Sequence, residues 1–120
     1  MSFLKKTNCL NSKGKKEGYW ERYWVEGKIF AKGNYTNGNK EGLWKYYFYN
    51  DQILATENYS NGSREGLCKY YYPNGNLFKE VCYKNNKVVG WVILYDENTG
   101  RPIEKNFISN NIMITVNLKK

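Results

Sequence analysis

Short runs rich in aromatic and β-branched residues alternate along this chain with turn-forming pairs drawn from Asn, Gly and Asp. The apolar positions do not recur with a period of 3.6, and glycine interrupts every segment that could form a helix, so strands are predicted and helices are disfavoured. Alternate residues of a strand share a face. In residues 18–24 one face would carry Gly18, Trp20, Arg22 and Trp24, and the other Tyr19, Glu21 and Tyr23.

The run Glu41-Gly-Leu-Trp-Lys-Tyr-Tyr-Phe-Tyr recurs along the chain. Related runs begin at Glu17, Glu65 and, in degenerate form, Val89, each 24 residues from the next. A fixed period of this size is typical of repeat architectures, in which each copy packs on its neighbours. We divide the chain into an N-terminal segment with half a repeat at 1–16, copies at 17–40, 41–64, 65–88 and 89–113, and a C-terminal edge strand with a basic tail at 114–120.

Each full copy carries two turn signals. Asn37-Gly38 and Asn61-Gly62 would join successive copies, and Asn74-Gly75 would join the two strands inside the third copy as a type I′ turn. The second copy has Asn50-Asp51 at that place, a pair that tolerates this geometry less well. Short hairpins throughout predict an all-β fold: an elongated, single-layer antiparallel β-meander of about four 24-residue hairpin repeats and about eight strands.

Alignment of the copies produces columns of aromatic and small residues. We expect the column members to form the core, because the chain has few aliphatic residues, and we expect glycines to let a ring from an adjacent strand lie flat across them. Cys68 occupies the Trp20 and Trp44 position and is interpreted as a buried substitution. The columns are Gly18, Gly42, Gly66 and Gly90; Trp20, Trp44, Cys68 and Val92; Tyr23, Tyr47, Tyr71 and Tyr95; Ile29, Ile53 and Leu77; and Tyr35, Tyr59, Tyr83 and Phe107.

The formal net charge of +8 has two interpretations. It could serve a nucleic acid or an anionic membrane surface. It could also reflect the codon usage of an AT-rich genome together with solubility. Arg, the residue best suited to phosphate, occurs only at Arg22, Arg64 and Arg101, and many lysines lie near the two ends of the chain, which favours the second interpretation.

The chain contains no histidine, which excludes Ser-His, Cys-His and His-metal catalysis. Cys9, Cys68 and Cys82 lack CxxC spacing and are too few for a zinc site. Whether Cys68 and Cys82 face each other depends on the strand register. The odd number of cysteines and the absence of an apolar leader at the N-terminus predict free thiols and a cytoplasmic localisation.

Glu17, Glu41 and Glu65 form an acidic column, with Lys40 and Arg64 directly before two of its members. The spacing of 24 residues puts each carboxylate in a different copy. We interpret the column as solvated ion pairs beside the turns rather than as a catalytic carboxylate pair. The sequence predicts no catalytic residue, no metal site and no cofactor.

The unit E-G-x-W-x-x-Y-Y-x-N-G-x-L, followed by a Tyr and N-G-K/R-x-x-G, resembles the bacterial variant of the MORN repeat found in YwqK-type antitoxin proteins. The resemblance covers residues from about 17 to 108. It implies an elongated, twisted, single-layer antiparallel sheet, often with a shallow aromatic groove, and a binding or scaffold protein rather than an enzyme. MORN repeats have also been linked to anionic lipids. The chain departs from the pattern at Cys68, at Asn50-Asp51 and in the last turn.

The rings that break the column pattern are the candidates for a binding surface, because Tyr, Trp and Arg are enriched at protein-binding hot spots. Nearby lysines would add charge. The candidate partner-binding residues are Trp24, Phe48, Tyr49, Tyr72, Trp91, Arg22, Lys45 and Lys69.

Three hypotheses for function follow. The first is a non-enzymatic protein-binding module, an antitoxin, immunity protein or inhibitor, that masks a toxin or a host or defence factor. The alternative is polyanion binding, to acidic membrane lipid or to single-stranded nucleic acid stacked on rings. The third is a small-ligand sponge, which the lack of a phosphate-binding loop makes weaker.

Overall fold

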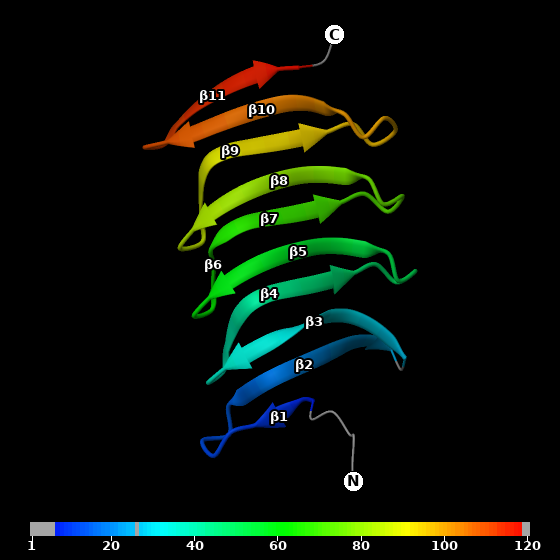
Figure 1. The fold of residues 1–120 in the computed structure, drawn as a ribbon, viewed down its shortest axis with the longest axis vertical. Helices are drawn as coiled ribbons and strands as arrows, with labels where there is room; N and C mark the ends of the chain where they lie inside the picture. Colours follow the sequence, from blue (N-terminus) through cyan, green and yellow to red (C-terminus); the bar gives the residue numbers. More distant parts are fainter. Residues whose placement is uncertain (1–6, 26, 119–120) are drawn as a thin grey trace.

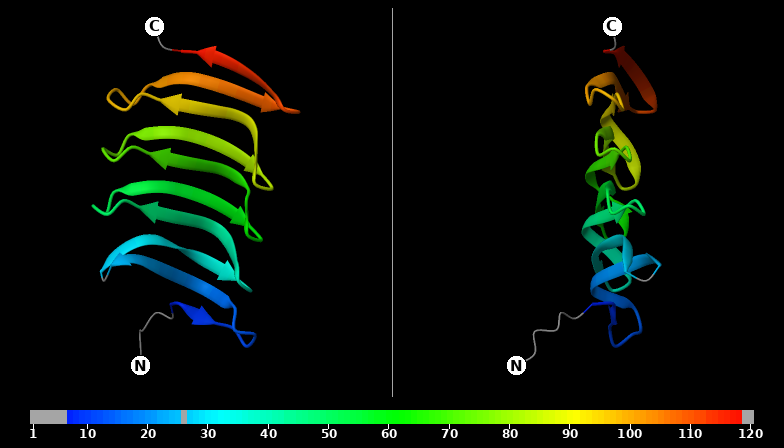
Figure 2. Two further views of the ribbon diagram at one scale, coloured as in Figure 1. Left: turned by 180° about the vertical axis from the view of Figure 1, so that it is seen from behind. Right: turned by 90° about the vertical axis from the view of Figure 1, so that its right-hand side faces the viewer.

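The computed structural model describes residues 7–25 and 27–118, and these residues form one open antiparallel sheet of 11 strands with no helix. Successive strands are neighbours across the sheet, and β6 pairs with β5 beside β7 (Figure 1). The sheet is a single twisted layer when viewed edge-on (Figure 2), and the longest dimension is 59 Å. The predicted single-layer β-meander is confirmed. No apolar helix long enough to cross a membrane occurs in these two ranges.

Each copy supplies one hairpin: β2 with β3, β4 with β5, β7 with β8, and β9 with β10. The number of strands exceeds eight for two reasons. β1 and β11 flank the copies, and a break at Glu65 divides one predicted strand into β6 and β7. The strands are β1 Cys9–Leu10, β2 Lys16–Val25, β3 Lys28–Thr36, β4 Asn39–Tyr47, β5 Ile53–Ser60, β6 Ser63–Arg64, β7 Gly66–Tyr71, β8 Leu77–Lys84, β9 Lys87–Tyr95, β10 Pro102–Ser109 and β11 Ile112–Asn117.

The turns predicted between successive copies at Asn37-Gly38 and Asn61-Gly62 are present, and their conformation is type I′. Asn37 and Gly38 have φ values of 50° and 87°, the left-handed values that both central residues of this turn require. Asn61-Gly62, Asn85-Asn86 and Asn110-Asn111 repeat the conformation. All four turns lie along one long edge of the sheet (Figure 1).

The turn inside the third copy differs from the prediction. Only Gly75 is left-handed there, with φ of 97°. Its N–H donates to the Tyr72 carbonyl at 2.9 Å, and the Tyr72 N–H donates to the Asn76 carbonyl at 2.8 Å. This is a type I turn followed by a left-handed residue, and Pro73 favours it because its φ is fixed near −65°. The type I′ prediction for Asn74-Gly75 was wrong for that reason.

The second copy makes the same turn without a glycine. Asp51 takes the left-handed position with φ of 72°, and its N–H donates to the Phe48 carbonyl at 3.0 Å. The Asn50 side chain accepts the Gln52 N–H at 3.1 Å. Asp and Asn tolerate this conformation better than other residues with a side chain, so Asn50-Asp51 can replace Asn-Gly.

The strand register divides the side chains between two faces, since residues paired across strands share a face. Every buried side chain of the described residues lies on one face, which we call the packed face; they are Ala31, Tyr35, Trp44, Ala55, Cys68, Val81 and Asn106. The other face, which we call the open face, carries exposed Leu43, Lys45, Leu67 and Trp91.

Trp44 is the centre of the packed face and is fully buried. Its indole Nε1 donates to the Asn34 carbonyl at 2.9 Å, and its ring meets Tyr35 edge-on with centroids 4.9 Å apart. The ring lies across Gly33, where an added Cβ would be 2.6 Å from Trp44 Cγ. The expected ring-over-glycine contact therefore exists, but at a glycine outside the predicted column.

The column glycines have a different role. Gly18, Gly42, Gly66 and Gly90 have φ between 72° and 87°, and an added Cβ would meet no atom within 4 Å. No ring covers them, so the predicted contact was wrong at these four positions. They are glycines because the backbone bulges there in a left-handed conformation that a side chain would strain.

The register also answers the cysteine question. Cys68 pairs with Val81 and Leu67 pairs with Cys82, so the two sulfurs lie on opposite faces and do not face each other. Both thiols are free. Cys68 is fully buried, as predicted, and burial raises the pKa of its thiol.

Candidate functional site

A polar network occupies the middle of the packed face. The Lys40 ammonium lies 4.9 to 5.2 Å from the ring centroids of Trp44, Tyr46 and Tyr59, and it donates to the Tyr46 hydroxyl at 2.7 Å. The Tyr46 and Tyr59 hydroxyls are 3.1 Å apart. Burial lowers the pKa of Lys40 and raises that of Tyr46 to about 12. The cation is thus held by rings rather than by an adjacent carboxylate.

Glu57 is the acceptor at the centre of this network. Its Oε1 accepts the Tyr59 hydroxyl at 2.6 Å, and its Oε2 accepts the Tyr70 hydroxyl and lies 3.8 Å from Arg64 Nη1. Burial raises the pKa values of both tyrosines, which remain neutral donors. No buried side-chain polar atom of the described residues lacks a hydrogen bond. This fully satisfied network stabilises the sheet and leaves no free group for a ligand.

The network repeats a column that sequence reasoning missed. Lys16, Lys40 and Arg64 are 24 residues apart, and each cation stacks on the Tyr nineteen positions later in the chain. The cation-to-centroid distances are 5.3 Å for Lys16–Tyr35, 5.0 Å for Lys40–Tyr59 and 4.2 Å for Arg64–Tyr83. The sequence signal for this column was a Lys or Arg nineteen residues before each of these column tyrosines.

The acidic column is not a row of ion pairs. Oε1 of Glu17, Glu41 and Glu65 accepts the backbone N–H of the first Asn in the next inter-copy turn, at 2.8, 2.8 and 3.2 Å. In the described ranges the ion pairs are Lys28–Asp51 and Arg64–Glu57. The ion-pair interpretation was wrong because the type I′ turn presents an otherwise unpaired backbone N–H, and the carboxylate accepts this fixed donor instead of pairing with a flexible lysine.

Two of the candidate rings form a second set of contacts between copies. The Trp24 indole donates to the Tyr47 carbonyl at 3.2 Å, and the Tyr72 hydroxyl donates to the Tyr95 carbonyl at 2.9 Å. Trp24 also packs on Phe30, with centroids 5.2 Å apart. These rings lie at the edge of the sheet that holds the turns within copies, and they join one copy to the next.

The open face consists of rows that run across the strands. The pairing places a charged row through its middle: Glu21, Lys32, Lys45, Thr56, Lys69, Glu80, Ile93, Lys105 and Val116. Beside it lies a row with exposed apolar side chains: Leu43 at 47%, Leu67 at 42% and Trp91 at 45% exposure. These three recur every second strand, about 10 Å apart. Trp91 packs edge-on against Phe107, with centroids 5.0 Å apart.

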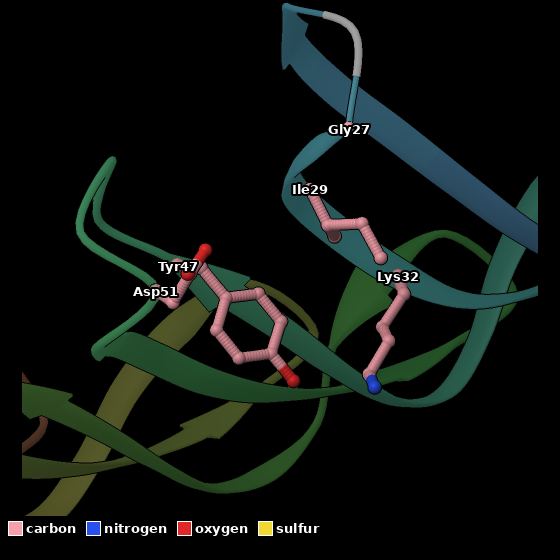
Figure 3. Close-up of a pocket in the computed structure, with 5 residues that line it drawn as sticks. All are labelled: Gly27, Ile29, Lys32, Tyr47 and Asp51. Atoms are coloured by element: carbon pink, nitrogen blue, oxygen red, sulfur yellow. The ribbon is translucent and has the colours of Figure 1, made fainter.

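Two shallow hollows on the open face meet at Lys32. One, of about 240 Å³, is lined by Gly27, Ile29, Lys32, Tyr47 and Asp51, and Lys32 Nζ is 5.5 Å from the Tyr47 ring centroid (Figure 3). The Lys32 amine and the Tyr47 hydroxyl point to the same side of this hollow (Figure 3). The other, of about 300 Å³, is lined by Tyr19, Lys32, Gly33, Asn34, Leu43 and Lys45.

The carboxylates of the charged row are engaged with tyrosines. Glu21 accepts hydroxyl hydrogen bonds from Tyr19 at 2.9 Å and Tyr23 at 2.7 Å, and Glu80 accepts one from Tyr95. Burial, with a smaller effect of the Glu21 hydrogen bond, raises the pKa of Tyr19 to about 12. Tyr23 is 45% exposed, so this column member lies outside the core that was predicted for it.

The eight predicted site residues do not form one cluster. Lys45, Lys69 and Trp91 share the open face, whereas Arg22 belongs to the packed face beside Phe30. Tyr49 lies at a turn, 5.6 Å from Lys28 Nζ. Trp24, Phe48 and Tyr72 occupy equivalent positions near the turn edge. Sequence reasoning did not include Leu43, Leu67 and Lys32; the first two are aligned with Trp91, which was the signal for them.

No group of three or more His, Cys, Asp and Glu side chains that could hold a metal ion is present in residues 7–25 and 27–118. The hollows described above are open and shallow, and they contain no paired carboxylates. The arrangement suits binding by a surface rather than chemistry on an enclosed substrate.

Comparison with known families supports this conclusion. The family model described as the MORN repeat variant matches residues 40–61 and 64–85, that is, most of the second and third copies. MORN repeats are in general non-enzymatic modules that bind proteins or membranes. No curated protein matches the chain.

Proposed function

We propose that this protein is a non-enzymatic binding module that recognises another protein through the open face of its sheet. One observation carries the proposal: exposed Leu43, Leu67 and Trp91 recur at a fixed interval beside Lys45 and Lys69 on a stiff scaffold. Apolar anchors next to charged side chains are the usual composition of a protein-binding surface. The packed face, in contrast, uses its rings and charges internally.

We propose further that binding inhibits the partner by covering its surface, as an antitoxin, immunity protein or other inhibitor does. A single-layer sheet with a long axis of 59 Å can cover a broad area without enclosing a substrate. We expect the protein to act in the cytoplasm, and the three free thiols support this, because a reducing compartment keeps cysteines unpaired.

The experiment is affinity capture of the partner from cells of the native host, with the L43S/L67S double variant as the probe of the open face. Both side chains are exposed, so the variant should fold. Leu10→Ser is the matched control, since Leu10 is 59% exposed but pairs with Lys16 on the other face. We expect the partner to be lost from the double variant and retained by the control.

Equal recovery by the wild type and the double variant would contradict binding through the open face. The inhibitor proposal has its own test. The captured partner is expressed alone and together with this protein, and its effect on growth or its activity is measured. Co-expression should relieve the effect, and the double variant should not.

A further inference from the structure

Two lysines, Lys32 on β3 and Lys45 on β4, lie directly opposite each other on the open face as cross-strand partners. Like charges directly opposite each other destabilise a sheet. Neither lysine takes part in an ion pair within the described ranges, and Lys69 follows two strands further on, across Thr56. The fold therefore tolerates an unfavourable arrangement of positive charge inside these two strands, away from the turn that joins them.

The surroundings of this pair favour a carboxylate with an apolar neighbour. Asn34 and Tyr47 add polar groups within reach of Lys32, and Leu43 supplies apolar surface at the rim of the larger hollow. An acidic side chain at this point would neutralise both ammonium groups, and the next side chain on the same face of an extended segment, about 7 Å away, could contact Leu43.

The charge pattern argues against a broad polyanion. Glu21 and Glu80 lie at the two ends of the lysine row, so the row from Glu21 to Glu80 reads negative, positive, positive, neutral, positive, negative. A membrane or a nucleic acid backbone that covered the whole row would meet these carboxylates as well. Arg22, the nearest candidate for bidentate phosphate recognition, is on the other face. A narrow acidic segment meets only the lysines.

We propose that the Lys32–Lys45 pair is the recognition site for an acidic, extended segment of the protein partner, with a carboxylate between the two ammonium groups and an apolar side chain on Leu43. This inference rests on the proposed function and specifies the chemistry of the partner.

The direct test is fluorescence anisotropy with a labelled peptide of about eight residues in which Glu and Leu occupy alternate positions of one face and Ser fills the other face (Glu-Ser-Leu-Ser repeated), so that each carboxylate has an apolar neighbour about 7 Å away on the same face of an extended chain. The same peptide with Lys in place of Glu reports binding by the apolar side chains alone. We expect the acidic peptide to bind, and we expect its binding to weaken strongly at about 0.5 M salt. The lysine peptide should not bind.

The variant is K32Q/K45Q, and its control is K84Q/K87Q. Lys84 and Lys87 are also cross-strand partners, so the control removes the same charge and the same opposed pair at a distant turn. We expect the K32Q/K45Q variant to bind the peptide about tenfold more weakly and the control to bind within about twofold of the wild type. A raised Tm of K32Q/K45Q would show that lost binding is not unfolding, because a like-charge pair has been removed.

Three results would overturn the proposal: no binding of the acidic peptide, equal loss in both variants, or lysine-dependent binding of an oligo-dT strand or phosphatidylserine vesicles without binding of the peptide. The captured partner separates the two proposals. If L43S/L67S loses the partner and K32Q/K45Q keeps it, the open face binds protein but the lysine site is wrong. If both variants keep it, both proposals fail.

Discussion

Gly33→Ala is a small change for which the structure predicts a large effect. At a position where the backbone suits alanine, removing a glycine usually stabilises a protein by about 0.4 to 1 kcal/mol, because the unfolded chain loses freedom. Gly33 is not left-handed, so backbone strain does not apply. The expected sign depends on Trp44 alone.

The magnitude follows from the contact. The new Cβ would lie 2.6 Å from Trp44 Cγ and closer to two other indole atoms, whereas carbon atoms normally approach to about 3.5 to 4.0 Å. The ring must move by about 1 Å, which strains its hydrogen bond to the Asn34 carbonyl. Overpacking of this kind costs about 1 to 3 kcal/mol, and we expect a net loss of about 2 kcal/mol in the free energy of unfolding. The Tm should fall by about 8 °C.

The assay is urea unfolding followed by far-UV circular dichroism, in a double-mutant cycle with Trp44→Val, which copies the residue of the fourth repeat. With the indole gone, Gly33→Ala should be neutral or stabilising, so the coupling energy should be about 2 kcal/mol. An equal loss in both backgrounds, or a higher Tm in the chain that keeps Trp44, would refute the reasoning.

Three further predictions concern the polar groups. Because burial raises the pKa of Tyr46 to about 12 from an unfolded value near 10, the folded state binds more protons in that range, and Tm should fall as the pH rises from about 10 to 12. The raised pKa values of Tyr59 and Tyr70 act in the same direction, and the lowered pKa of Lys40 acts in the opposite one. Lys45→Gln should raise the free energy of unfolding by about 0.5 kcal/mol in urea melts, since it relieves like-charge opposition. Glu41→Ala should cost about 1 kcal/mol and speed amide exchange at Asn61, whose N–H it leaves without its acceptor.

Matched controls exist for the three. Tyr46→Phe should reduce the alkaline slope, and an unchanged slope would contradict the role of this tyrosine. Lys105→Gln, whose neighbours across the strands are Ile93 and Val116, removes a charge without a like-charged partner and should not stabilise. Glu97→Ala removes an exposed carboxylate and should leave Asn61 exchange unchanged.

The fold could be predicted from the sequence because its determinants are local. An Asn-Gly pair between two apolar runs specifies a type I′ hairpin through backbone conformation alone, and a repeat of 24 residues multiplies that signal. The third-copy turn was harder, since Pro73 and Asn74-Gly75 favour different turns and proline decided the outcome.

The candidate site was less predictable because it depends on long-range pairing. The sequence showed that Lys32 and Lys45 exist, but only the register makes them opposite each other. Glycine raised a similar difficulty. Glycine is required at Gly33 because the Trp44 ring occupies the space of a side chain, and at Gly42 because the backbone is left-handed. The sequence shows glycine at both positions, and only the structure distinguishes the two reasons for it.

The contacts between copies have a consequence for the length of the molecule. Trp24 to Tyr47 and Tyr72 to Tyr95 each span twenty-three residues and cross one boundary between copies. Glu17 to Asn37 and Glu41 to Asn61 each span twenty residues inside one copy, where they hold the turn that leads to the next copy. Duplication or deletion of one whole 24-residue unit returns every such donor to an equivalent acceptor, whereas a change of any other length misaligns all that follow. The sheet can therefore lengthen or shorten in steps of one hairpin, and each added hairpin brings its own hydrogen bonds to the copy beside it.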